Sequence, residues 1–132
     1  VVIVVAATAF LGMLVAAVAI RTALIAEYHL GEFFIVKQAC YQYIEQHDGA
    51  WPRSWDDLRK VGPEFDYEGL SRNVSVDFDA DPRVLASQTP ASFKAVQPKE
   101  PCFEHDHHLL QLIDLLKKYH KPLQEAEPSN SD

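Results

Sequence analysis

Residues 1–48 read VVIVVAATAFLGMLVAAVAIRTALIAEYHLGEFFIVKQACYQYIEQHD, and this stretch decides the fold because no proline interrupts it. Val1–Ile20 contains no charged residue, and about 20 apolar residues are enough to cross the hydrocarbon core of a bilayer. From Glu27 onward, less polar side chains recur every three or four residues, which is typical of one buried helix face. We therefore predict one long helix whose first half lies in a membrane and whose second half packs on a head.

Two other interpretations of the apolar run remain open. Ala17–Ala19 resembles the small-x-small site at which a signal peptide is cut, although the run is longer than a typical signal-peptide core. A helix buried in a larger core would have the same composition. We favour a retained anchor because apolar residues continue past this site to Ala26, and the side chain of Arg21 can reach toward lipid headgroups.

The chain of 132 residues divides by composition into three parts. We predict a transmembrane anchor over residues 1–26, a small α+β head over residues 27–120 and a disordered tail over residues 121–132. A head of this size buries a limited core, so the second half of the long helix is expected to support it. The net charge is −7, and an acidic surface repels phosphate backbones. We therefore expect no nucleic acid partner.

An aromatic turn follows the long helix. Gly49 can take the left-handed conformation that often ends helices. Ser54 is a good N-cap, so we expect a short helix over about Trp55–Lys60. An exposed aromatic binding platform is the alternative to a packed turn. The side chains that we expect to pack this turn onto the long helix are Trp51, Pro52, Ser54, Trp55 and Leu58.

The remainder of the head predicts the α+β fold class. Glu64–Arg72 has the composition of a charged loop, and apolar and polar side chains alternate over Asn73–Asp79, which is typical of a half-buried strand. We expect two more strands at Arg83–Ser87 and Ser92–Val96, and a small antiparallel sheet against the long helix. A stripe of leucines predicts an amphipathic C-terminal helix over about His107–His120.

Potential metal ligands cluster just before this last helix, but their spacing matches no established zinc pattern. Asp106 is more simply a helix cap. We therefore expect no metal, no cofactor and, because no catalytic motif is present, no enzymatic activity. Cys40 and Cys102 are candidates for a disulfide, with two free buried thiols as the alternative. The candidate metal ligands are Cys102, His105, His107 and His108.

The order of these features resembles a known family. A long helix, apolar and then amphipathic, runs into a glycine, an aromatic-proline turn and a short helix that carries a leucine. In this the chain, up to about Lys60, resembles type IV pilin-like proteins and in particular the pseudopilins of type II secretion. The residues that carry the resemblance are Tyr43, Gly49, Trp51, Pro52, Ser54, Trp55, Asp57 and Leu58.

The resemblance implies a single-pass subunit of the inner cell membrane, with its head outside the cytoplasm and its apolar helix bundled with those of other subunits. The prepilin cleavage signature of that family is not visible in the sequence. The alternative is therefore a membrane-anchored extracytoplasmic domain that binds or assists another envelope protein. The expected partners are membrane lipid and either envelope proteins or further copies that associate through the N-terminal helix.

Overall fold

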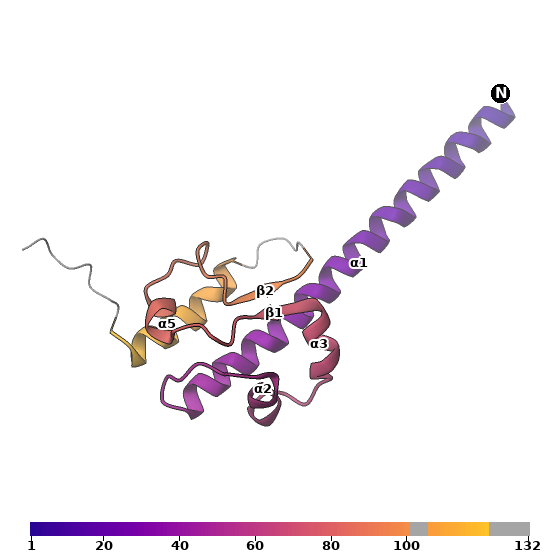
Figure 1. The fold of residues 1–132 in the computed structure, drawn as a ribbon. Helices are drawn as coiled ribbons and strands as arrows, with labels where there is room; N and C mark the ends of the chain where they lie inside the picture. Colours follow the sequence, from indigo (N-terminus) through magenta and orange to yellow (C-terminus); the bar gives the residue numbers. More distant parts are fainter. Residues whose placement is uncertain (101–105, 122–132) are drawn as a thin grey trace, which may run out of the picture.

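The computed structural model describes residues 1–100 and 106–121, and one long helix dominates it (Figure 1). Helix α1 spans Val2–Gln46, which is 45 residues. It ends where the chain turns through two positive φ angles, 51° at Asp48 and 89° at Gly49. The Gly49 amide donates to the Ile44 carbonyl at 2.9 Å and satisfies one of the last helical acceptors. The single long helix that the sequence predicts is confirmed.

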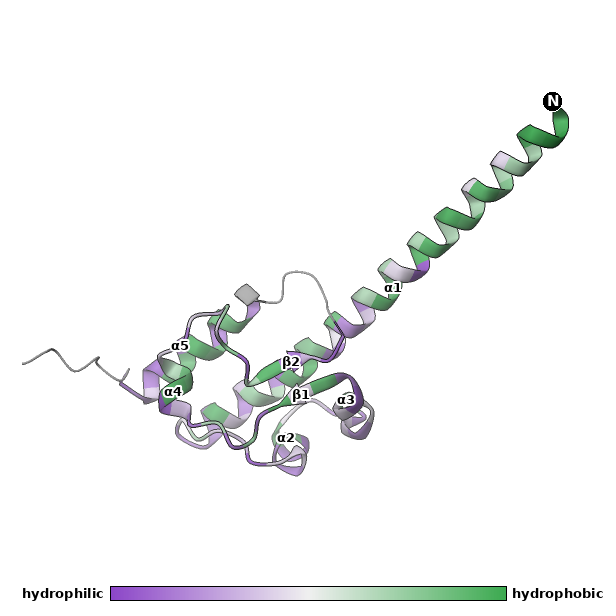
Figure 2. Ribbon diagram, turned by 45° about the horizontal axis from the view of Figure 1, so that its top comes forward, coloured by the Kyte–Doolittle hydropathy of each residue, from purple (hydrophilic) through white to green (hydrophobic). Residues whose placement is uncertain are grey.

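The two halves of α1 have different surroundings (Figure 2). Every residue of the first half, from Val1 to Ile25, is exposed, and no other described helix or strand lies beside it (Figure 1). In the second half the face that carries Phe33, Cys40 and Ile44 is fully buried. This face forms the centre of the head. The core of the head is therefore built around the C-terminal half of α1, and the N-terminal half projects from it.

Two short helices pack beside the second half of α1. Helix α2 (Trp55–Val61) begins at the predicted cap, where the Ser54 hydroxyl accepts a 3.2 Å hydrogen bond from the Asp57 amide. Helix α3 (Tyr67–Asn73) lies where we expected a loop over Glu64–Arg72, and that expectation is wrong. The side chain of Asp66 caps α3 by accepting from the Gly69 amide at 3.1 Å.

The sheet is smaller than predicted. Strand β1 (Val74–Val76) pairs antiparallel with β2 (Val96–Pro98), and Ser75 lies opposite Gln97. The strand expected over Asn73–Asp79 is therefore shorter than its alternating pattern suggests, because a turn begins at Asp77. Of the strand expected over Ser92–Val96, only Val96 is in a strand.

The strand expected at Arg83–Ser87 is also wrong. This segment belongs to helix α4 (Pro82–Ala86). The Asp81 side chain accepts from the Arg83 amide at 2.9 Å, and Pro82 lies in the first turn, where a proline is readily accommodated.

The C-terminal helix is confirmed. A 3-10 turn, η1 (Asp106–Leu109), leads into α5 (Leu110–Tyr119), which packs against α1 and α4. Helices α2 and α5 flank α1 on opposite sides (Figure 2). The buried face of α5 consists of Leu112, Ile113, Leu115 and Leu116.

Candidate functional site

The first candidate site is the uncovered apolar surface of α1. An 18-residue window of this helix has a mean hydropathy of 2.7, and none of that window is buried. By length and composition α1 could cross a membrane. The two threonine hydroxyls of its exposed half are satisfied within the helix, since Thr8 donates to the Val4 carbonyl at 3.0 Å and Thr22 donates to the Val18 carbonyl at 2.8 Å. These side chains therefore need no water, as a lipid environment demands.

A polar cluster lies where α1 enters the head. Glu32 is 5% exposed, and its Oε1 accepts a 3.0 Å hydrogen bond from Asn73 Nδ2 at the end of α3. Its Oε2 lies 3.5 Å from Nδ1 of His29. The charge of Glu32, together with a hydrogen bond to it, raises the pKa of Tyr28. The cluster fixes α1 to α3 close to the point where the helix becomes free.

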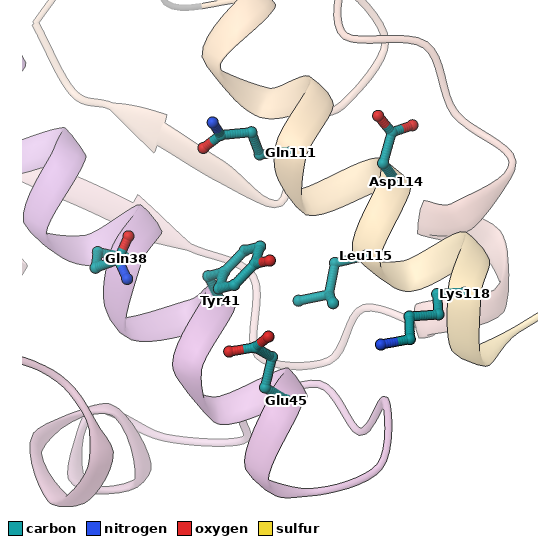
Figure 3. Close-up of a pocket in the computed structure, with 7 residues that line it drawn as sticks. All are labelled: Gln38, Tyr41, Glu45, Gln111, Asp114, Leu115 and Lys118. Carbon is teal, nitrogen blue, oxygen red and sulfur yellow. The ribbon is translucent and has the colours of Figure 1, made fainter.

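The second candidate site is a groove between α1 and α5, with a volume of about 490 Å³ (Figure 3). The ring of Tyr41 and the largely buried side chain of Leu115 lie between the two helices. Within the described part of the chain, the carboxylates of Glu45 and Asp114 have no ion-pair partner. The complete lining is Gln38, Tyr41, Glu45, Gln111, Asp114, Leu115 and Lys118.

A buried lysine fixes one wall of this groove. Lys37 is 7% exposed, and its Nζ donates to Gln111 Oε1 at 3.2 Å. The same ammonium lies 5.0 Å from the ring centre of Phe34, a cation–π contact. Burial lowers the pKa of Lys37. Because the Gln111 carbonyl is engaged with Lys37, this side chain is held at the groove wall.

The aromatic turn is packed into the head. Trp51 is 4% exposed, and its Nε1 donates to the Asp77 carbonyl at 2.8 Å. Trp55 is half-buried, edge-on to Phe78 with 5.6 Å between the ring centres, while Pro52 and Leu58 are buried. A cleft of about 230 Å³ lies beside this turn and is lined by Ala50, Trp51, Arg53, Phe78, Asp79, Ala80 and Pro82.

The candidate metal ligands are not brought together in the part of the chain that the structure describes. Cys102 and His105 lie outside the described residues, as does the side chain of His107. The ring of His108 lies edge-on to Phe34, with 4.5 Å between the ring centres. Among the residues that are described, no three His, Cys, Asp or Glu side chains are grouped as metal ligands.

Cys40 is a fully buried thiol, and burial raises its pKa to about 12. Its proposed disulfide partner, Cys102, is not among the described residues, so that pairing stays a prediction. The predicted disordered tail falls almost entirely on residues 122–132, which are likewise outside the described part.

Comparison with known proteins adds no assignment, because no family model, curated protein or solved structure matches the chain. Sequence reasoning missed the groove. Gln38 and Glu45 are recognisable as the polar side of the amphipathic helix, and Asp114 interrupts the leucines of α5. Nothing local indicates that α5 lies beside those residues, so the groove emerges only from the packing of α5 on α1.

Proposed function

We propose that the protein is a single-pass, membrane-anchored structural or assembly subunit with pilin-like architecture. The observation that carries the proposal is the continuity of α1, which is exposed up to Ile25, apolar there apart from Arg21, and buried in the core of the head from Phe33. An exposed apolar surface this extensive marks a contact with lipid or protein. In this role α1 anchors the chain, and the head contacts other subunits rather than a substrate.

The exposed N-terminal half of α1, residues 1–25, is called the free half below. It also carries features that favour helix association. Small side chains recur at intervals of three and four residues, so they share one face of the helix. Small residues let helix backbones approach closely in lipid. Gly12 has open space around it, so its surface is available to a neighbouring helix. The small residues of this face are Ala9, Gly12, Ala16, Ala19 and Ala23.

Two measurements on the full chain test the proposal. Fractionation of cells should place the chain in the membrane pellet, released by detergent, and recovery from the aqueous fraction without detergent would contradict the anchor. Oxidative cross-linking should then join two chains that carry Ala16→Cys, with Cys102→Ser in this variant and in its control. Leu14→Cys is the matched control, because it lies at a similar depth about 160° around the helix. Equal yields at both positions, or none at either, would refute assembly through the small face.

The head outside the cytoplasm is part of the same proposal and comes from the pilin resemblance. A membrane-impermeant maleimide tests it on a Cys102→Ser chain that carries Lys60→Cys, since Lys60 is exposed on α2. Labelling of intact cells supports the proposed orientation. Labelling that requires broken cells would place the head inside the cell.

The groove between α1 and α5 favours a second candidate function, an anchored domain that binds another envelope protein. A photoreactive phenylalanine analogue at Tyr41, at the centre of the groove, separates the two functions. An adduct with twice the mass of the chain supports self-assembly. An adduct of any other mass identifies a different protein and favours the binding domain.

A further inference from the structure

We propose that the groove between α1 and α5 receives helix α2 of a second copy of this chain, so that neighbouring heads join side by side. The inference rests on the proposed function, because it requires copies anchored in parallel in one bilayer. The apolar half of α1 does not specify how the heads of neighbouring copies contact each other, and the groove and α2 would supply that contact.

The groove and α2 lie on different sides of α1. The end of α2 lies against α1 at Ala39, since a Cβ on Gly62 would come within 2.6 Å of the Ala39 Cβ. Tyr41 follows Ala39 by two residues and therefore points about 160° away around the helix. Helix α2 and the groove thus lie on opposite sides of α1 at the same height (Figure 3). In two chains anchored at equal depth, α2 of one can face the groove of the next.

The groove and α2 also carry complementary charges. The groove carries two carboxylates, Glu45 and Asp114, and one ammonium, Lys118. All three side chains are exposed, and none has an ion-pair partner among the described residues. The aromatic ring of Tyr41 projects from α1 toward Leu115 in the same groove and can stack on a guanidinium group (Figure 3).

The outer face of α2 has the opposite pattern, with two cations and one carboxylate. Arg59 and Lys60 are exposed in its last turn. Asp56 is exposed in its first turn and pairs with Arg59 at 3.4 Å. An exposed pair of this kind is weak, so Arg59 can exchange its partner for a groove carboxylate. Each of these three charges therefore has a counterpart of opposite sign in the groove. The fourth charge of α2, on Asp57, is half-buried and accepts a 3.0 Å hydrogen bond from the Arg53 amide.

The contact is expected to be weak without the membrane. Stable interfaces between soluble proteins bury about 1,600 Å², which is more than one short helix in one groove provides. Anchoring two copies in one bilayer raises their effective concentration, so a weak contact can still be populated. Because the two surfaces differ, the contact is heterologous and continues to a third copy, giving rows or rings.

Cysteine cross-linking tests the contact directly, with the buried Cys40 as the remaining native thiol. Full chains that carry Lys60→Cys or Asp114→Cys, each with Cys102→Ser, are expressed together with tags of different size and treated with a short bis-maleimide. We expect the mixed 60–114 product and neither symmetric product. The control, Glu68→Cys on α3, is also exposed but lies outside both surfaces, and it should give no product with Asp114→Cys. Symmetric products as abundant as the mixed one would overturn the inference.

A charge reversal provides a second test, and the two residues that it changes, Lys60 and Glu45, are exposed. Lys60→Glu should reduce photo-cross-linking from position 41 about fivefold, since it places two like charges together. Adding Glu45→Lys to the same chain should restore the yield. A photo-cross-linking yield that Lys60→Glu leaves unchanged, or an adduct with a different protein, would overturn the contact.

The two proposals fail in different ways. If the 60–114 product is absent while Ala16→Cys chains still cross-link, the copies associate through α1 alone and only the groove contact is wrong. If neither product forms, both the groove contact and the assembly function are wrong.

Discussion

Asn73 donates its side-chain amide to Glu32 at 3.0 Å, which joins the start of the sheet to the helix 41 residues earlier in the chain. The carbonyl of Asn73 also accepts from the Lys99 amide at 2.8 Å, next to strand β2. One residue therefore links α1, the end of α3 and the sheet. The carboxylate that it bonds is buried, so the loss of this bond leaves a desolvated charge with one contact fewer.

We predict that Asn73→Ala lowers the free energy of unfolding by about 1–3 kcal/mol, because it leaves the buried Glu32 carboxylate underbonded. Urea unfolding of the full chain in detergent, followed by tryptophan fluorescence, measures the change. Arg72→Ala is the matched control, since its pair with Glu68 is exposed and is worth less than about 1 kcal/mol. A smaller loss for Asn73→Ala than for Arg72→Ala would contradict the prediction.

Two glycines of α1 and its turn should respond in opposite directions to alanine. At Gly49, φ is 89°, and a Cβ would come within 2.8 Å of Tyr119 Cγ, so Gly49→Ala should destabilise the head by several kcal/mol. At Gly31 an added Cβ would meet no side chain or other element of the described residues within 4 Å, and alanine favours the helix by about 1 kcal/mol. Urea midpoints of the two variants provide the measurement. A Gly49→Ala chain as stable as the parent would show that the turn can relax.

The indole hydrogen bond of Trp51 should be measurable. Trp51→Phe removes the donor to the Asp77 carbonyl and leaves a void beside Phe93, so we expect a loss of about 2–4 kcal/mol. Trp55→Phe is the control, because Trp55 is only half-buried and its ring contact with Phe78 can be kept by phenylalanine. Circular dichroism during urea unfolding suits both variants. Equal losses would argue against a special role for the indole bond.

Cys40 should be unreactive in the folded chain. Burial raises its pKa to about 12, so almost no thiolate exists at pH 8. In a Cys102→Ser chain, iodoacetamide should modify Cys40 only after urea is added, as mass spectrometry can show. Rapid modification without urea would mean that the core opens readily around this residue.

The same shift predicts the direction of the alkaline response. The thiol pKa in the folded chain lies above its ordinary value of 9.0, so the unfolded chain loses this proton first as the pH rises. The contribution is fully present below pH 9.0 and is lost as the pH approaches about 12. A Cys40→Ala chain should show a flatter decline over that range, which urea midpoints at several pH values would measure.

The long helix could be predicted because its cause is local. Its apolar run, its later periodicity and the absence of proline are all legible in the sequence, and so are the Ser54 cap and the leucines of α5. Helix α3 could not be predicted, because it buries only Tyr67 and Leu70 and two residues are too few to form a periodic hydrophobic pattern. Its charged residues then have the composition of a loop.

Other errors have physical causes of a similar kind. Val84 and Leu85 look strand-like, but Asp81 and Pro82 begin a helix whose single turn buries Leu85 and Ala86 together. Here the capping signal was present and outweighed the strand preference of Val84. The groove was not predictable, since the position of Asp114 beside Tyr41 depends on how α5 crosses α1, which no short-range pattern specifies.

An unbroken α1 means that the free half and the head share one rotation about the helix axis. Inserting a single residue after Ala26 would swing the head by about 100° and lift it by about 1.5 Å relative to the residues before it. Seven inserted residues, close to two full turns, would nearly restore the rotation of the head about the helix axis while raising the head by about 10 Å. In an anchored chain, the residues of the free half would thus decide toward which neighbour α2 and α5 are aimed, although they touch neither helix.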